Sequence, residues 1–334
     1  AYAAAGAMAA SVISESTSLL FLFASYKRFG EVRLPGETWR KHLRQGRRTL
    51  SELMQIGLPT TGHGVVHSLY GAFQPLLITT SLAAAGVGTV LATKQFGMLA
   101  GYVFPLLFMP SFITHSLTTA LVPAISEAVA NKNSLLMHER MDQAMRLGFL
   151  VGAPATVILY EWATPLTSLI YHSPEAGVLL KILAPMFLLH YFDAPLHAIL
   201  LGHGRAKASF MNYLISTVLK ALAIFILGRE FGIIGAACGI GIGMVILTML
   251  NFFSVSGTVG FYVDIRRYLK VGIAMSLMAL SGQWLSGYLG ELGLPLLAQT
   301  AASIAAALGV YFAALELMRV LRRKRKNRWF HRLV

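Results

Sequence analysis

The sequence predicts an all-α, polytopic membrane helical bundle of about nine transmembrane helices. The 334 residues are 56% hydrophobic and only 13% charged, against roughly 45–50% and 25% in soluble domains. The mean hydropathy is +0.64. Apolar runs of about 20 residues, the length that a helix needs to cross a hydrocarbon core, recur along the chain. Such spans must be helical because lipid offers the backbone no other hydrogen-bond partner.

The apolar runs and their polar flanks place the spans in chain order. They cover residues 2–25, 53–80, 95–121, 145–162, 178–201, 209–228, 232–254, 268–289 and 294–318. Pro59, Pro105, Pro110, Pro154, Pro185 and Pro195 lie inside them. Each proline removes a backbone donor and favours a kink. Gly235, Gly239 and Gly243 recur every four residues, a spacing that predicts close packing between two membrane helices.

Basic residues alternate between the connecting segments, as the positive-inside rule requires. Segment 26–51 and the tail from Arg319 each hold eight Lys and Arg residues. Two each lie in segments 122–144, 202–208 and 255–267, whereas 82–93, 163–177 and 290–293 hold none and 229–231 holds only Arg229. This pattern predicts a cell (inner) membrane protein with its N-terminus outside and its C-terminus in the cytoplasm.

Composition and motifs exclude several classes of protein. Of the 28 Lys and Arg residues, 16 lie in two blocks that flank apolar spans, a placement that suits anionic lipid headgroups rather than nucleic acid. The single cysteine, Cys238, has no partner for a disulfide or a Cys-based metal site. No P-loop, nucleophile elbow or HExxH motif occurs. We therefore predict no enzyme and no cofactor, and the remaining function is movement of a solute.

Polar residues form a stripe on the second span. His63, His67, Tyr70 and Gln74 follow one another at i, i+4, i+7 and i+11, on one helix face. Polar side chains are costly at bilayer depth, so the stripe faces either a water-filled cavity or the polar groups of another helix. Both alternatives stay open. No metal site is predicted, because no third ligand lies in register.

The third span adds a cation and a second polar face. Lys94 opens it, and Tyr102 follows. The Lys94 ammonium either extends to the outer interface or points inward to hold an anionic headgroup. Ser111 and His115 lie four residues apart further along and share one face.

Ionisable residues inside spans are functional-site hypotheses by default. Asp193 lies between His190 and His197 in the fifth span, and Lys220 lies in the middle of the next. Asp193 is expected either to form an ion pair with Lys220 that orients two helices, or to bind a coupling proton. Glu15, on the first span, is a comparable candidate for the coupling-ion site.

Several collinear motifs over residues 1–265 resemble one family. AAAGAM, LPTTG, ATKQFG, PSFIT, TALVPAISEA, QAMRL and ILAPMFLLHYF are similar to the stage V sporulation protein B group of polysaccharide-biosynthesis membrane proteins. That group belongs to the superfamily of lipid II flippases, O-antigen flippases and multidrug and toxic-compound extruders.

The resemblance implies two pseudo-symmetric six-helix lobes around a V-shaped cavity, often followed by two extra helices. Residues 1–50 would hold the last helix of the N-terminal lobe and a basic inter-lobe loop. Residues 51–255 would form the C-terminal lobe, 256–318 the two additional helices and 319–334 a basic cytoplasmic tail. The first five helices of the fold are then expected to be missing from an N-terminally truncated chain.

The resemblance also implies a substrate and a mechanism. Ala92-Thr93-Lys94 is similar to a segment of the lipid II flippase in which a cavity arginine binds pyrophosphate. Lys94 would supply the same positive charge as that arginine. Residues 268–318 would form the groove for an undecaprenyl tail. The expected function is flipping of an undecaprenyl-pyrophosphate-linked glycan or similar peptidoglycan precursor by alternating access, in spore cortex or cell-wall synthesis.

Under that expectation the residues that meet sugar or peptide are His63, His67, Tyr70, Gln74, Tyr102, Ser111 and His115. Two alternatives remain. A cation-coupled multidrug exporter would use Asp193 or Glu15 as its ion site, and a non-transporting scaffold would recruit cell-wall synthases through the basic loops. Membrane lipids are expected partners of all three, and nucleic acid is not.

Overall fold

The computed structural model describes residues 2–29, 39–260 and 265–320. All regular secondary structure in these ranges is helical, which confirms the predicted all-α class. The chain divides into two compact units, Ala1–Glu52 and Leu53–Val334. Residues 30–38 of the predicted basic loop and 321–334 of the predicted basic tail lie outside the described residues.

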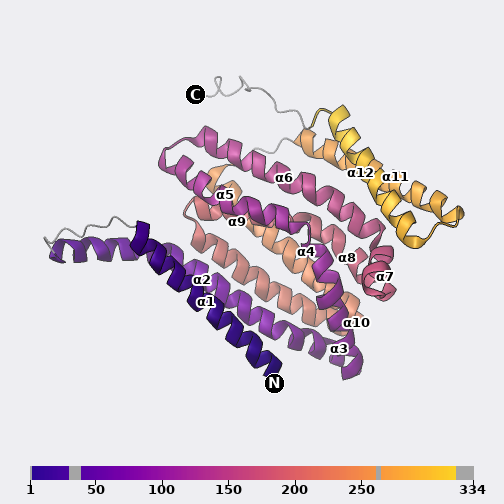
Figure 1. Cartoon of the computed structure of the whole chain (residues 1–334), viewed down its shortest axis with the longest axis horizontal. Coiled ribbons are helices and arrows are strands. Elements are labelled where there is room, and N and C mark those ends of the chain that lie inside the picture. Colours follow the sequence, from indigo (N-terminus) through magenta and orange to yellow (C-terminus); the bar gives the residue numbers. More distant parts are fainter. Residues whose placement is uncertain (1, 30–38, 261–264, 321–334) are drawn as a thin grey trace. The chain divides into compact units, whose positions relative to one another are not determined.

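The helices follow one another without strands in the described ranges, and one π-helical turn, η1, interrupts the third predicted span (Figure 1). Their bounds are α1 (Tyr2–Phe29), α2 (Trp39–Ala84), α3 (Thr89–Met98), η1 (Leu99–Val103), α4 (Phe104–Phe108), α5 (Ser111–Ala130), α6 (Ser134–Glu161), α7 (Ala163–Tyr171), α8 (Pro174–His190), α9 (Asp193–Gly202), α10 (Ala206–Val259), α11 (Ile265–Glu291) and α12 (Leu296–Leu317).

Five described segments are long and apolar enough to cross a membrane. They are Thr89–Phe108, Ser134–Glu161, Pro174–Gly202, Ala206–Val259 and Leu296–Leu317. The chain is thus a multi-pass membrane helical bundle, and the span count of nine stays a prediction.

Prolines explain two breaks inside predicted spans. Span 95–121 is divided at residues 109–110, where Pro110 caps α5. Span 178–201 is divided between α8 and α9, because Pro195 has no amide hydrogen to donate to the Tyr191 carbonyl one turn earlier. Helix α2 begins at Trp39, well before the predicted start at residue 53. Its first turns are basic but contain good helix formers, which hydropathy does not detect.

Helix α10 is a hairpin of two arms, residues 206–231 and 233–259, which correspond to two predicted spans. The break is Gly232, with φ 62° and ψ −143°, a conformation that strongly favours glycine. A Cβ on Gly239 would lie 2.6 Å from the Ile224 backbone nitrogen, and one on Gly243 would lie 2.3 Å from the Lys220 Cβ. The four-residue glycine repeat therefore packs the second arm against the first, as predicted.

The last two helices pack against α6 and α7 through a separate apolar core. Ala153 and Val157 of α6 meet Ala274, Met278 and other buried side chains of α11 and α12. The Tyr311 hydroxyl donates to the Leu150 carbonyl at 3.2 Å. This pair of helices is thus part of the unit formed by Leu53–Val334.

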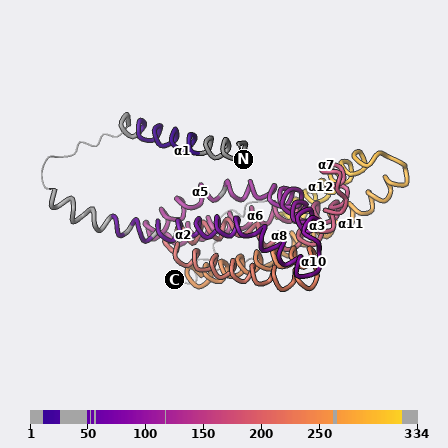
Figure 2. The backbone as a smooth tube through the Cα atoms, turned by 90° about the horizontal axis from the view of Figure 1, so that it is seen from below, coloured from indigo at the N-terminus to yellow at the C-terminus, as the bar shows by residue number. Residues whose placement is uncertain are grey.

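The helices of this unit run between two ends. Figures 1 and 2 both show α3 and α7 at one end and the α5–α6 turn at the other. The first end includes the 163–177 segment, which has no Lys or Arg, and the second includes the turn with Lys132. Under the charge pattern of the sequence, these are the predicted outer and cytoplasmic ends.

Candidate functional site

Helix α2 meets the first arm of α10 through polar and aromatic side chains. The His67 Nδ1 lies 2.9 Å from the Tyr213 hydroxyl, in a hydrogen bond. The His63 ring centroid lies 4.0 Å from that of Tyr213. His63 is half-buried and His67 is exposed. The structure therefore shows the predicted contact with a neighbouring helix, and the water-filled cavity stays a prediction.

One turn further along, Tyr70 contacts Lys220 of α10. The Lys220 Nζ lies 3.9 Å from the centre of the Tyr70 ring, which is cation–π geometry. The aliphatic part of Lys220 packs against the backbone of Gly243. The ammonium is thereby held between α2 and the two arms of α10.

A chain of hydrogen bonds links α9 to both arms of α10. The Asn212 Nδ2 donates to the Asn251 Oδ1 at 2.9 Å and to the Ser254 Oγ at 2.8 Å. The Asn251 Nδ2 in turn donates to the Asp193 Oδ1 at 2.8 Å. Asn212 and Asn251 are 8% and 2% exposed. Because buried polar groups are costly without partners, this chain holds the Asp193 carboxylate at a fixed place.

Asp193 is an electrostatic neighbour of three histidines and of Lys220. Its charge acts on His63, His190, His197 and Lys220. Its hydrogen bond in the described structure goes to Asn251, and no ion pair with Lys220 occurs among the described residues. The interaction of Asp193 with Lys220 is thus longer-range than the predicted direct pair.

The remaining histidines surround this acid. The His197 Nδ1 lies 2.7 Å from the Ser209 Oγ. His190 packs edge-on against the rings of Phe108 and Phe187, with centroids 5.5 and 5.2 Å away. His115 on α5 is an electrostatic neighbour of both His190 and His197. We name the set His63, His67, His115, His190, Asp193, His197, Tyr213, Lys220 and Asn251 the acid–histidine cluster.

Other predicted residues lie outside the acid–histidine cluster. Ser111 is buried and its hydroxyl has no hydrogen-bond partner among the described residues. Gln74 is half-buried further along α2. Glu15 lies on α1 in the first unit, where its side chain is exposed. No group of three or more described His, Cys, Asp or Glu side chains is arranged to hold a metal ion.

Lys94 and Tyr102 line a pocket of about 430 Å³ at the α3–α7 end. The opposite wall is the α7–α8 turn, with Tyr171, His172 and Glu175. The Tyr102 and Tyr171 rings stack, with centroids 4.7 Å apart and planes 17° apart. The structure therefore separates these two predicted residues from the acid–histidine cluster.

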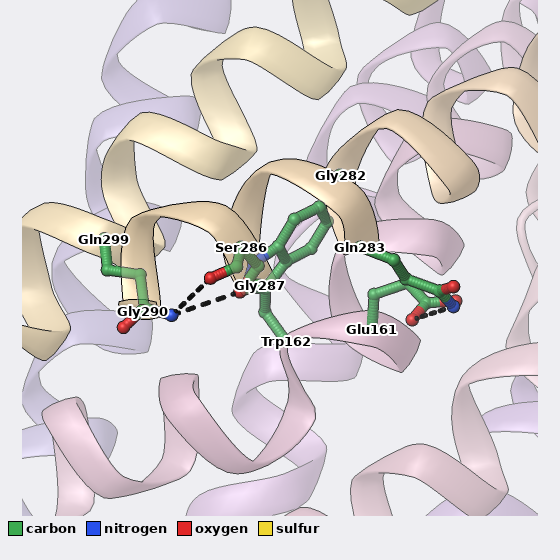
Figure 3. Close-up of a pocket in the computed structure, with 8 residues that line it drawn as sticks. All are labelled: Glu161, Trp162, Gly282, Gln283, Ser286, Gly287, Gly290 and Gln299. Atoms are coloured by element: carbon green, nitrogen blue, oxygen red, sulfur yellow. Dashed lines mark hydrogen bonds between the residues drawn. The ribbon is translucent and has the colours of Figure 1, made fainter. Parts of the chain in front are cut away.

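A second pocket, of about 340 Å³, lies between the α6–α7 junction and helices α11 and α12 (Figure 3). Its polar side chains bond to the protein itself. The Gln283 Nε2 donates to the Glu161 Oε2 at 2.8 Å, and the Gln299 Nε2 donates to the Ser286 carbonyl at 2.7 Å. Trp162 closes one side against Gly282.

Sequence reasoning identified Lys220 of α10 but missed four other residues of that helix, Asn212, Tyr213, Asn251 and Ser254. A usable signal existed for the two asparagines, because amides are costly in apolar spans. The two asparagines are 39 residues apart in the sequence, and they come into contact because the hairpin at Gly232 places the two arms of α10 side by side.

Two family models match the chain. Residues 1–129 match the family described as Polysaccharide biosynthesis protein, and residues 98–226 match the family described as MatE. The two matches overlap on α3 to α5 and together reach into the first arm of α10.

Two curated proteins of Bacillus subtilis (strain 168) are similar over long stretches. Stage V sporulation protein B is 39% identical over 333 residues, which are 98% of this chain and 63% of that protein. Sporulation protein YkvU is 34% identical over 73% of this chain and 55% of that protein. The chain thus spans less than two thirds of the length of either relative.

Two solved structures share the fold. The lipid II flippase MurJ, in an inward closed conformation, has a TM-score of 0.60 and 17% identity, over 92% of this chain and 61% of that one. An outward-facing multidrug resistance MATE family transporter of the MOP superfamily has a TM-score of 0.51 and 16% identity, over 79% and 64%. These proteins are a flippase and a transporter, not enzymes. The chain is therefore a multi-pass membrane helical bundle that is similar to stage V sporulation protein B over nearly its whole length, with segments that match the Polysaccharide biosynthesis protein and MatE families.

Proposed function

We propose that the protein flips a lipid-linked oligosaccharide, such as a peptidoglycan precursor, across the cell membrane by alternating access during sporulation or cell-wall synthesis. The C-terminus would then lie in the cytoplasm, and an undecaprenyl-pyrophosphate-linked glycan would be the partner. The single observation that carries the proposal is the acid–histidine cluster, polar and ionisable groups held between helices of a membrane bundle.

The cluster supports a wet passage better than simple helix packing. Ionisable side chains at membrane depth mark substrate or ion pathways when they face an aqueous cavity. His67 is exposed and His63 half-buried on the same face of α2. In transporters built from two lobes, such a face borders the cavity while the lobes rock around it.

Helix breaks support movement of this kind. Proline breaks at Pro110 and before Pro195 divide long helices into shorter rods. Such breaks are tolerated in a membrane where the freed backbone groups are buried in protein or line a cavity.

Reconstitution tests the proposal directly. The complete protein, purified and placed in lipid vesicles, is expected to move a fluorescent undecaprenyl-pyrophosphate-linked disaccharide from the inner to the outer leaflet. Accessibility of the label to a membrane-impermeant quencher measures the movement. No movement, from protein that elutes as a single folded species, would contradict the flippase assignment.

Lys94 gives a prediction in cells. Replacing Lys94 by alanine in the complete protein is expected to abolish complementation of a cortex-defective strain, because an ammonium that pairs with phosphate is lost. Protein abundance should not change, since the side chain is exposed and forms no hydrogen bond or ion pair in the described structure. Spore-cortex formation and an immunoblot measure the two quantities. Full complementation would remove Lys94 from the mechanism.

A second candidate function is cation-coupled export of drugs. Asp193 favours it, because a half-buried carboxylate held by Asn251 offers a place for a coupling proton. Transport of cationic dyes that stops when the ion gradient is dissipated would support this function over lipid flipping.

A further inference from the structure

The pocket of Figure 3, which we name the Glu161 pocket, presents hydrogen-bond acceptors. Both of its glutamines direct the amide nitrogen to the protein, because the Gln283 Nε2 donates to the Glu161 Oε2 and the Gln299 Nε2 donates to the Ser286 carbonyl (Figure 3). The two amide oxygens and the Glu161 Oε1 accept no hydrogen bond from any described residue. Amide and carboxylate oxygens can only accept. The Glu161 pocket therefore suits a ligand that donates hydrogen bonds.

The Glu161 pocket also carries a negative charge. Glu161 is the one ionisable side chain among the described residues that line it, and it is half-buried at the C-terminal end of α6. Segments 163–177 and 290–293, which adjoin the lining residues, contain no Lys or Arg. A carboxylate with amide oxygens beside it binds an ammonium group through charge-assisted hydrogen bonds. An anion would be repelled by the same carboxylate.

The surroundings of the Glu161 pocket are typical of a membrane–water interface. On α11, which lines the pocket, Trp284 and Tyr288 stack with ring centroids 5.9 Å apart, and they are 72% and 51% exposed. Exposed Trp and Tyr side chains are enriched at the level of lipid headgroups. The α11–α12 turn that follows Gly290 exposes four leucines, a pattern that marks contact with membrane, and they are Leu292, Leu294, Leu296 and Leu297. A ligand that arrives from the membrane therefore fits this place better than one from water.

We propose that the Glu161 pocket holds the ammonium group of a phosphatidylethanolamine. A primary ammonium has three N–H donors, which match the carboxylate oxygen and the two free amide oxygens. At about 340 Å³ the pocket is large enough for this headgroup. Because α7 lies at the predicted outer end of the bundle, the lipid would come from the outer leaflet.

This lipid is a resident of the membrane and not the transported cargo, so the proposal goes beyond the proposed function and does not depend on it. It also differs from the groove that the family resemblance implies for an undecaprenyl tail along residues 268–318. An isoprenoid tail has no hydrogen-bond donor, and it would leave the acceptors of the Glu161 pocket without partners.

The affinity of the protein for individual lipids tests the proposal. The complete protein in detergent is incubated with phosphatidylethanolamine, phosphatidylcholine or phosphatidylglycerol of one acyl composition, and native mass spectrometry measures the Kd of the first bound lipid. We expect phosphatidylethanolamine to bind about tenfold or more tightly than the other two. The choline headgroup has no N–H donor, and the glycerol headgroup has no cation.

Two variants and a matched control locate the effect. Glu161→Gln is expected to raise the Kd for phosphatidylethanolamine about tenfold, because it removes the charge while an amide oxygen still accepts from Gln283. Gly287→Leu should weaken binding by filling the pocket, and a Cβ at Gly287 meets no atom within 4 Å, so the helix is kept. The control is Glu139→Gln in the same helix, since Glu139 also accepts from a glutamine amide, that of Gln143 at 3.2 Å, but does not line the pocket. Its Kd values should equal those of wild type.

Equal Kd values for phosphatidylethanolamine in wild type and Glu161→Gln would overturn the proposal, and so would equal affinity of wild type for phosphatidylethanolamine and phosphatidylcholine. The soluble headgroup O-phosphoethanolamine is expected to bind about tenfold or more weakly than the lipid, because it has no acyl chains. Equal affinity for the two would assign the pocket to a soluble amine and overturn the lipid assignment. None of these measurements requires flipping, so this proposal and the proposed function can fail separately.

Discussion

Replacing Asp193 by asparagine is expected to lower the flipping rate on the order of tenfold or more, which corresponds to about 1.4 kcal/mol of barrier. Asp193 is the acid whose charge acts on three histidines and Lys220. Without it, these groups lose their counter-charge in a low-dielectric interior, and any step that needs their protonation is disfavoured. The initial rate of flipping in vesicles, at equal protein per vesicle, measures the effect.

Replacement by asparagine removes the negative charge of Asp193 and keeps the shape of its side chain. Its side-chain oxygen still accepts the hydrogen bond from Asn251, so the stability should change by only ~1 kcal/mol. The matched control is Asp142→Asn, at a half-exposed carboxylate that pairs with Arg267 at 3.0 Å and is not a member of the cluster, and its flipping rate should equal that of wild type. A wild-type rate in the Asp193→Asn protein would exclude a role for the charge.

The sequence predicted where the long apolar helices lie better than where they break. Apolar length reports a membrane span because lipid imposes it on any sequence. The break near Pro195 is a local effect of the missing amide hydrogen. It could not be singled out in advance, because six prolines lie inside the predicted spans and each could cause such a break. The early start of α2 at Trp39 was missed because charged residues form helix without raising hydropathy.

The sequence predicted which polar residues share a helix face, but not which faces meet to form the acid–histidine cluster. Spacing placed His63 and His67 on one face, and the structure shows that face against Tyr213. Which helix lies opposite depends on tertiary packing, which periodicity does not contain. Lys94 illustrates the same limit, because its pocket is completed by the α7–α8 turn, about 80 residues further along, where no motif marks a site.

Replacing Gly239 by alanine is expected to destabilise the complete protein by about 1–3 kcal/mol. The added Cβ would lie 2.6 Å from the Ile224 nitrogen and 2.7 Å from the Ala223 carbonyl carbon, and backbone atoms cannot rotate away. The two arms of α10 must therefore separate. Because the Asn212–Asn251 hydrogen bond joins these arms, the same displacement should weaken the support of Asp193. Unfolding in mixed detergent micelles measures the stability.

The control is the same substitution in the same helix. Gly257 lies on the second arm of α10 with no atom within 4 Å of an added Cβ, so Gly257→Ala introduces no contact. It should be neutral or stabilise the protein by up to ~1 kcal/mol, since alanine favours helix over glycine. If both variants unfolded alike, the packing of the arms would not depend on Gly239. If Gly239→Ala were destabilised but flipped at the wild-type rate, the hairpin would support the fold without positioning Asp193.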